Sequence, residues 1–133
     1  MRAQLAMASL AVLLYGAAGC TQGPKYYPVS GTVTLDGKQL ERGDIFFVEI
    51  SGRYGPDPGK IEDGRFQFKA KAGKKRVEIS ASKILLGGAK GAGGEPVPEE
   101  FLSPEYNTQS KLTGEVKPEG PNEFEFKLHG RKK

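Results

Sequence analysis

The sequence predicts an all-β protein built as an antiparallel β-sandwich of seven short strands. Runs in which apolar and polar residues alternate recur along the chain, the pattern of strands with one buried face. Turn-forming residues separate these runs, because the 133 residues include 19 Gly and 9 Pro. Beyond the apolar N-terminal segment, no stretch of roughly ten residues or more has helical periodicity. Two packed sheets are therefore the simplest way to hide one core.

The first predicted strand, residues 29–35, alternates apolar and polar side chains and ends at Asp36-Gly37, a pair that suits a tight turn. Residues 38–43 are too polar to pair directly and are expected to extend this connection. Residues 44–50 form the second strand. Its apolar side chains lie on both faces, which indicates a central position in a sheet.

A hairpin is predicted next. Residues 51–59 are dense in Gly and Pro and indicate a loop, after which residues 60–62 and 65–70 pair around Asp63-Gly64. The inward side chains of the second strand of this hairpin are expected to be Phe66, Phe68 and Ala70.

Residues 75–84 predict a longer strand, again with strict alternation. Its inward side chains are expected to be Val77, Ile79 and Ala81. Residues 85–110 then break the alternation with a Gly- and Pro-rich connection. A connection of this length in a compact domain is either functional or disordered.

The last two predicted strands are residues 111–117 and 123–128. They complete a domain that spans residues 29–130, and residues 131–133 form a basic tail. The strand pairs differ in length and turn chemistry, so the domain contains no internal repeat.

The N-terminus predicts a signal peptide over residues 1–19. Arg2 precedes an apolar run that is shorter than the ~20 residues needed to span a bilayer and that ends in small residues, so a transmembrane helix is the weaker interpretation. Residues 17–20, Ala-Ala-Gly-Cys, resemble the bacterial lipobox. That resemblance implies cleavage before Cys20 and acylation of Cys20, which would explain an unpaired Cys in an exported chain. The alternative is an ordinary signal peptide with an incidental Cys.

Acylation of Cys20 would attach the chain to membrane lipid, because more than one acyl chain gives a stable anchor. The protein is then expected to be exported and held at the cell envelope. Thr21 stands where Asp marks inner-membrane retention in enteric bacteria, which favours the outer membrane. Residues 20–28 would form a lipidated tether of at most ~28 Å, so the domain stays near its membrane.

Composition excludes several classes of function. The chain is too short for a multidomain enzyme, and one Cys and one His exclude most metal cages, Cys/His nucleophile pairs and disulfide frameworks. His129 is therefore expected to be a solvated side chain at the end of the last strand. We expect no cofactor, no metal site and no catalytic residues.

Six segments of the chain carry a resemblance to one known family. They are YPVSGTVTLDGK (27–38), GKIEDGRFQFKA (59–70), GKKRVEI (73–79), PVPEE (96–100), YNTQSKLT (106–113) and GPNEFEFKL (120–128). These segments resemble small planctomycete lipoproteins with a carboxypeptidase-regulatory-like or transthyretin-like domain. The resemblance covers nearly all of the chain after the signal peptide and implies a seven-stranded Greek-key sandwich of the prealbumin type at the cell envelope. The enzymes of the transthyretin-like class, which hydrolyse hydroxyisourate, depend on several His residues and a C-terminal Tyr-Arg-Gly-Ser motif that this sequence lacks.

Aromatic residues in the predicted loops suggest a recognition face. Tyr54, Phe101 and Tyr106, with Asn107, could stack on sugars or partner side chains. The alternative, which we favour, is that Phe101 and Tyr106 are buried anchors that order the long connection.

A basic cluster brackets the turn before residue 75. Lys71, Lys74, Lys75 and Arg76 are expected either to be solvated or to attract an anionic membrane surface, which suits a lipid-anchored domain. Acidic residues are interspersed through the rest of the chain and the net charge is only +4, so we expect no nucleic-acid partner.

These observations leave three hypotheses for function. The first is a non-enzymatic lipoprotein whose domain is a binding or structural module for an envelope protein. The second is an accessory domain that binds polysaccharide, and the third, which the sequence disfavours, is a hydrolase that uses His129.

Overall fold

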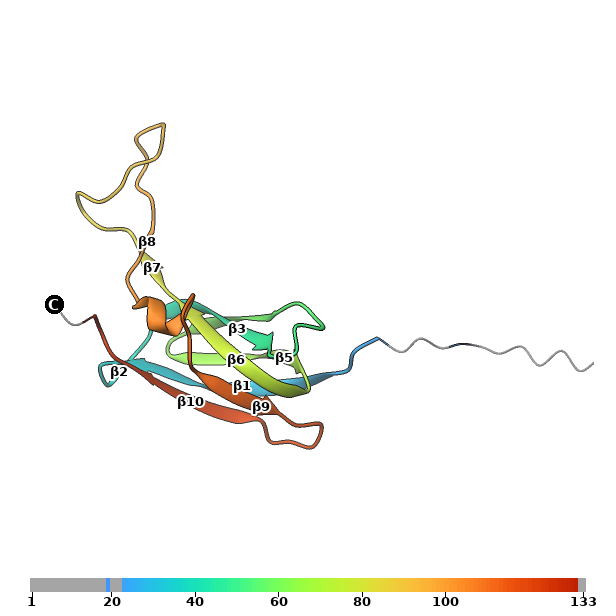
Figure 1. Ribbon diagram of the computed structural model, residues 1–133. Helices are drawn as coiled ribbons and strands as arrows, with labels where there is room; N and C mark the ends of the chain where they lie inside the picture. The colour runs from blue at the N-terminus through green and yellow to red at the C-terminus, as the bar shows by residue number, and fades with distance from the viewer. Residues whose placement is uncertain (1–18, 20–22, 132–133) are drawn as a thin grey trace, which may run out of the picture.

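The computed structural model describes residue 19 and residues 23–131. Most of the predicted signal peptide, the predicted lipidation site Cys20, and residues 132–133 of the basic tail lie outside the described residues. The chain is all-β, as predicted, and short turns join most of its strands (Figure 1). Its elements are β1 (Tyr26–Leu35), β2 (Lys38–Gln39), β3 (Arg42–Glu49), β4 (Asp57–Glu62), β5 (Arg65–Lys71), β6 (Gly73–Ser80), β7 (Ser82–Lys83), β8 (Glu99–Glu100), the 3-10 helix η1 (Pro104–Tyr106), β9 (Thr113–Val116) and β10 (Glu123–Leu128).

One sheet holds eight of the strands in the described part of the chain. Its order is β10-β1-β5-β4-β3-β6-β9, and β2 pairs with β1 outside this path. Strands β7 and β8 form a separate two-stranded sheet. All seven predicted strands are present, and β3 lies between β4 and β6 as its two apolar faces indicated.

The prediction that every strand pair is antiparallel is wrong for β1 and β10. These strands run in the same direction, with Ser30 opposite Glu123 and Leu35 opposite Leu128. Parallel neighbours need a long connection between them, and here it is all of the chain between Leu35 and Glu123. Alternation along a strand fixes its faces but leaves its direction open, so the sequence pattern could not exclude this arrangement.

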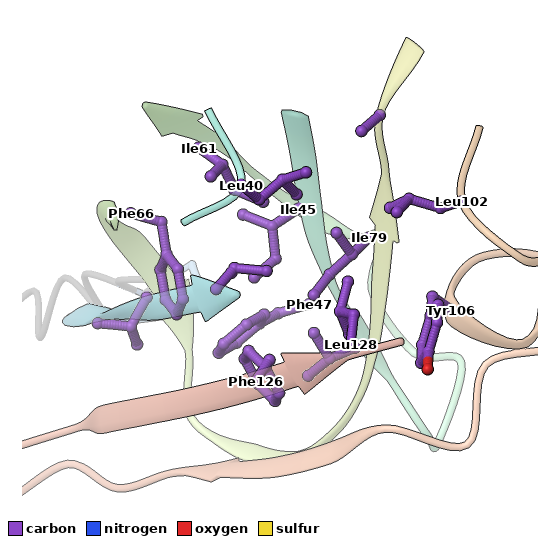
Figure 2. Close-up of a cluster of buried hydrophobic side chains, with 14 of the residues drawn as sticks. Leu40, Ile45, Phe47, Ile61, Phe66, Ile79, Leu102, Tyr106, Phe126 and Leu128 are labelled. Carbon is purple, nitrogen blue, oxygen red and sulfur yellow. The ribbon is translucent and has the colours of Figure 1, made fainter. Parts of the chain in front are cut away.

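The sheet is strongly curled around one core. Phe47, on β3, makes edge-to-face contacts with Phe68 on β5 and with Phe124 on β10, at centroid distances of 5.1 and 5.3 Å. Since β10 is four strands away from β3 in the sheet order, this contact requires the sheet to turn back on itself. Figure 2 shows Phe47 in the middle of the buried side chains, with Leu128 and Phe126 of β10 below it. The inward positions predicted on β5 and β6 are confirmed, although Phe68 is only partly buried.

The two Asp-Gly pairs form the tight turns that the sequence predicted. Asp36 and Gly37 have φ angles of 50° and 80°, and Asp63 and Gly64 have 51° and 73°. Positive φ at both central residues suits the twist of a two-residue hairpin. Residues 38–43 were expected only to extend the connection after the first turn. This expectation is wrong for β2, which pairs with the end of β1 directly after the turn. The polar side chains of β2 do not prevent this pairing, which uses main-chain groups only.

Several predicted boundaries are also wrong. Strand β1 begins at Tyr26, three residues before the predicted start at residue 29. The predicted loop 51–59 is three residues shorter than expected, because β4 begins at Asp57, whose side chain is buried. The predicted strand 75–84 is divided at Ala81 into β6 and β7. The connection 85–110 contains β8 and η1, which give it an ordered backbone.

Gly31→Ala should destabilise the domain although it adds one methyl group. A Cβ at this position would collide with the carbonyl oxygen of Phe124 on β10 and lie 2.5 Å from Cζ of Phe66. The main chain of the β1–β10 pair would have to separate, and we expect a loss of about 1–3 kcal/mol in the free energy of unfolding. Urea unfolding would measure it. Gly55→Ala is the matched control, because no atom of the described chain lies within 4 Å of its Cβ position. Equal stability of the two variants would contradict the prediction.

Candidate functional site

The two ends of the sheet carry different features. At one end the N-terminal segment enters β1 beside the turn between β5 and β6, since Tyr26 pairs with Lys71. We call this the tether end. Strand β6 starts there at Gly73 and runs the length of the sheet, about 26 Å at ~3.3 Å per residue, to the place where β7 begins. Figure 1 shows the start of β1, in blue, on one side and the segment around β7 and β8 projecting on the other.

A buried ion cluster lies at the tether end. The carboxylate of Asp57 accepts a hydrogen bond from the Lys71 ammonium and another from the Lys71 main-chain N–H at 2.9 Å. Nζ of Lys75 is 3.7 Å from Oδ2 of Asp57. The Lys75 side chain is 0% exposed, and no described residue forms a hydrogen bond with its Nζ. Two ammonium groups thus share one carboxylate inside the protein.

Strand alternation places Lys75 in the core. It lies on the same face of β6 as Val77 and Ile79, which are fully buried. Extending that alternation by two residues would have identified Lys75 as an inward side chain, a signal that the sequence analysis did not use. No comparable pattern marks Asp57, which comes directly after a Pro- and Gly-rich loop.

The environment of Lys71 favours its charged form. Burial alone would lower the pKa of this ammonium, but the hydrogen bond and negative charge of Asp57, together with Tyr26, raise the pKa above its usual value. The rings of Tyr26 and Tyr54 lie 5.1 and 5.8 Å from Nζ of Lys71. Both distances permit cation–π attraction.

The predicted basic surface is therefore wrong for two of its four residues. Lys71 and Lys75 are buried and directed at Asp57, so neither can be a solvated side chain or touch a membrane surface. Lys74 is exposed at the turn. Arg76 is exposed on the outer face of β6, where it pairs with Glu78 at 2.6 Å.

Large apolar side chains are exposed at the tether end. Tyr26 is 51%, Ile50 62% and Tyr54 40% exposed. Ile50 follows β3, and its N–H donates to the carbonyl of Lys74. With the exposed cations Arg53 and Lys74, these three residues make up what we call the tether-end face.

The opposite end carries a projecting arm, which we define as residues 82–100. Strands β7 and β8 form its base, and Lys90 bridges to Pro96 near its tip. The base is attached to the body by Glu100, whose carboxylate accepts from the N–H groups of Ala81 and Leu102. Four large apolar side chains of the arm are exposed, and Leu86 is completely so at 105%. They are Ile84, Leu85, Leu86 and Val97.

The predicted recognition face does not form. Tyr106 is buried against the core, and its hydroxyl accepts from the main-chain N–H of His129 at 2.9 Å (Figure 2). Phe101 packs partly against the core, with Nζ of Lys83 5.0 Å from its ring. Asn107 caps η1, where its Oδ1 accepts from the N–H of Thr108. Tyr54 is at the tether end, beside Lys71. The alternative, that Phe101 and Tyr106 anchor the long connection, is confirmed.

His129 is exposed, and its Nδ1 is 3.9 Å from Oδ1 of Asp36. Within the described residues, no three His, Cys, Asp or Glu side chains gather as a metal site would require. The same residues contain no helix with the length and hydrophobicity of a membrane crossing. The chain matches no protein-family model, no curated protein and no solved structure.

Proposed function

We propose that this chain is a non-enzymatic lipoprotein, anchored through acylated Cys20, that serves as a binding or assembly module at the cell envelope. One observation carries the proposal: β1, the first strand after Cys20 in the sequence, begins at one end of the domain, and the apolar arm projects from the other. An anchored molecule of this shape would hold its arm away from the membrane. The exposed side chains of the arm favour a protein partner over a polysaccharide, because they are aliphatic rather than aromatic.

We also propose that the curled sheet is a Greek-key sandwich of the transthyretin-like class, in the lipoprotein family that the sequence resembles. Support comes from the seven predicted strands and from the edge-to-face packing of Phe47 on aromatic rings of β5 and β10. The outer membrane is the proposed location, on the basis of Thr21.

The absence of catalysis is part of this proposal. A hydrolase would need His129 to act with a nucleophile, and this residue, the chain's single His, lies exposed beside Asp36. We propose neither a cofactor nor a nucleic-acid partner.

The anchor is tested by the mass of the N-terminus of protein purified from its native membrane. Cleavage before Cys20 and a mass increase of more than one acyl chain on this residue are expected. Cys20→Ser should abolish the added mass and release the protein from the membrane fraction. An unmodified Cys20 in the native protein would refute the anchor.

The arm is tested by photo-crosslinking in living cells. A photoreactive amino acid at position 86 should form one discrete protein adduct, whereas the same group at position 123, exposed on β10, should not. Leu85→Ser and Val97→Ser, combined with the probe at 86, should abolish the adduct. Both residues are exposed, so the free energy of unfolding should change by no more than about 0.5 kcal/mol. An adduct that survives both substitutions, or that forms equally at both positions, would contradict the role of the arm.

A further inference from the structure

The tether-end face combines apolar rings with positive charge, next to the point where the proposed anchor joins the domain. We propose that this face docks on the surface of an anionic phospholipid bilayer. This inference rests on the proposed lipid anchor. It adds that the domain lies against the membrane in one orientation instead of moving freely on its tether.

The exposed side chains of this face suit the interface between lipid and water. Tyr26 and Tyr54 each have an apolar ring and a polar hydroxyl, and tyrosine is enriched at the headgroup level of membranes. Ile50, the third apolar residue of the face, is aliphatic and more than half exposed. They come from the start of β1 and from the residues that follow β3, and the alternating directions of β1, β5, β4 and β3 bring these segments to the same end.

The charge of this end matches an anionic surface. Lys25, Arg53, Lys74 and Lys117 are exposed there. Three acids lie at the same end: Glu115 opposite Lys74, Glu119 in the adjacent β9–β10 connection, and the half-buried Glu49, whose carboxylate accepts from the N–H of Tyr54. Lys117 belongs to this end because Val116 pairs with Gly73. Beneath the face, two ammonium groups share the single carboxylate of Asp57, which leaves one further positive charge. Basic residues close to anionic headgroups are attracted to them within about a Debye length.

The length of the tether keeps this end within reach of the lipid. From Cys20 to Tyr26 the chain makes six peptide steps, at most about 21 Å when fully extended. The opposite end is held farther away by the length of β6. An anchored domain therefore meets the bilayer with its tether end first.

The chain contains no Trp, so a single substitution supplies a specific fluorescent reporter. The lipidated full-length protein carrying Tyr54→Trp would be reconstituted into vesicles of phosphatidylethanolamine and phosphatidylglycerol. We expect a blue-shifted emission and quenching by a nitroxide on the lipid headgroup. Leu86→Trp, on the arm, is the matched control and should show neither effect. Ile50→Trp is a second reporter in case Tyr54→Trp impairs folding.

Charge is tested with the same reporter. Vesicles of phosphatidylcholine alone, raised salt, or Arg53→Gln with Lys74→Gln should each reduce the blue shift and the quenching. Co-sedimentation with the vesicles and the mass of Cys20 measure the anchor separately. An anchored protein in which Tyr54→Trp and Ile50→Trp behave like Leu86→Trp would overturn the docking and leave the anchor intact. Loss of co-sedimentation together with an unmodified Cys20 would refute the proposed function itself, and the docking with it.

Discussion

Asp57→Ala should destabilise the domain by about 3–5 kcal/mol, because it leaves the ammonium groups of Lys71 and Lys75 buried without a countercharge. Small domains are stable by only about 5–15 kcal/mol, so this one substitution would remove a large part of the total. Urea unfolding followed by circular dichroism would measure the loss. We expect a folded protein at low temperature with a strongly reduced unfolding midpoint.

Two further substitutions show whether the loss of stability in Asp57→Ala comes from the burial of its ion pairs or from the loss of any ion pair. Asp44 pairs with Lys60 on the surface, and Asp44→Ala should cost no more than about 1 kcal/mol. Lys75→Met should be neutral or stabilising, because it replaces a buried ammonium that has no hydrogen-bond partner in the described chain and leaves Lys71 paired with Asp57. A large loss in Lys75→Met would show that this ammonium has a stabilising partner after all.

Phe47→Ala should have an effect of similar size for a different reason. The ring is fully buried and contacts Phe66, Phe68 and Phe124, so its removal leaves a cavity between β3, β5 and β10. We expect a loss of about 3–5 kcal/mol in the free energy of unfolding. Thermal and urea unfolding would both report it.

The control for Phe47→Ala is an aromatic side chain outside the core. Tyr54→Ala removes a partly exposed ring together with its cation–π contact to Lys71, and should cost no more than about 1 kcal/mol. Equal losses in the two variants would mean that Phe47 is not at the centre of the packing.

The strands were predictable because their signal is local. Alternation over a few residues fixes which side chains face the core, and it placed Phe66, Val77 and Ile79 correctly. The Asp-Gly pairs fixed two turns, because few other residues adopt positive φ at low cost. The parallel direction of β10 depends on where a distant strand lies, and no local pattern carries that information.

The candidate sites were less predictable, for reasons visible in particular residues. The residue type of Lys75 indicates a surface side chain, whereas the alternation of β6 indicates an inward one, and the sequence does not show that Asp57 is its partner. Tyr54 and Tyr106 are both aromatics in predicted loops, yet Tyr54 is exposed at the tether end and Tyr106 is buried at the end of η1. Residue type allowed recognition for both and favoured a buried anchor for Tyr106, and only long-range packing shows where each ring lies.

The position of β1 has a mechanical consequence. The strand that continues from the N-terminal segment lies between β5 and β10 and is bonded to both. Hydrogen bonds between strands run across the strand axis, so a force that pulls β1 lengthwise would shear both ladders at once instead of opening them one bond at a time. A domain anchored through its N-terminus would thus resist tension with the hydrogen bonds of both ladders together.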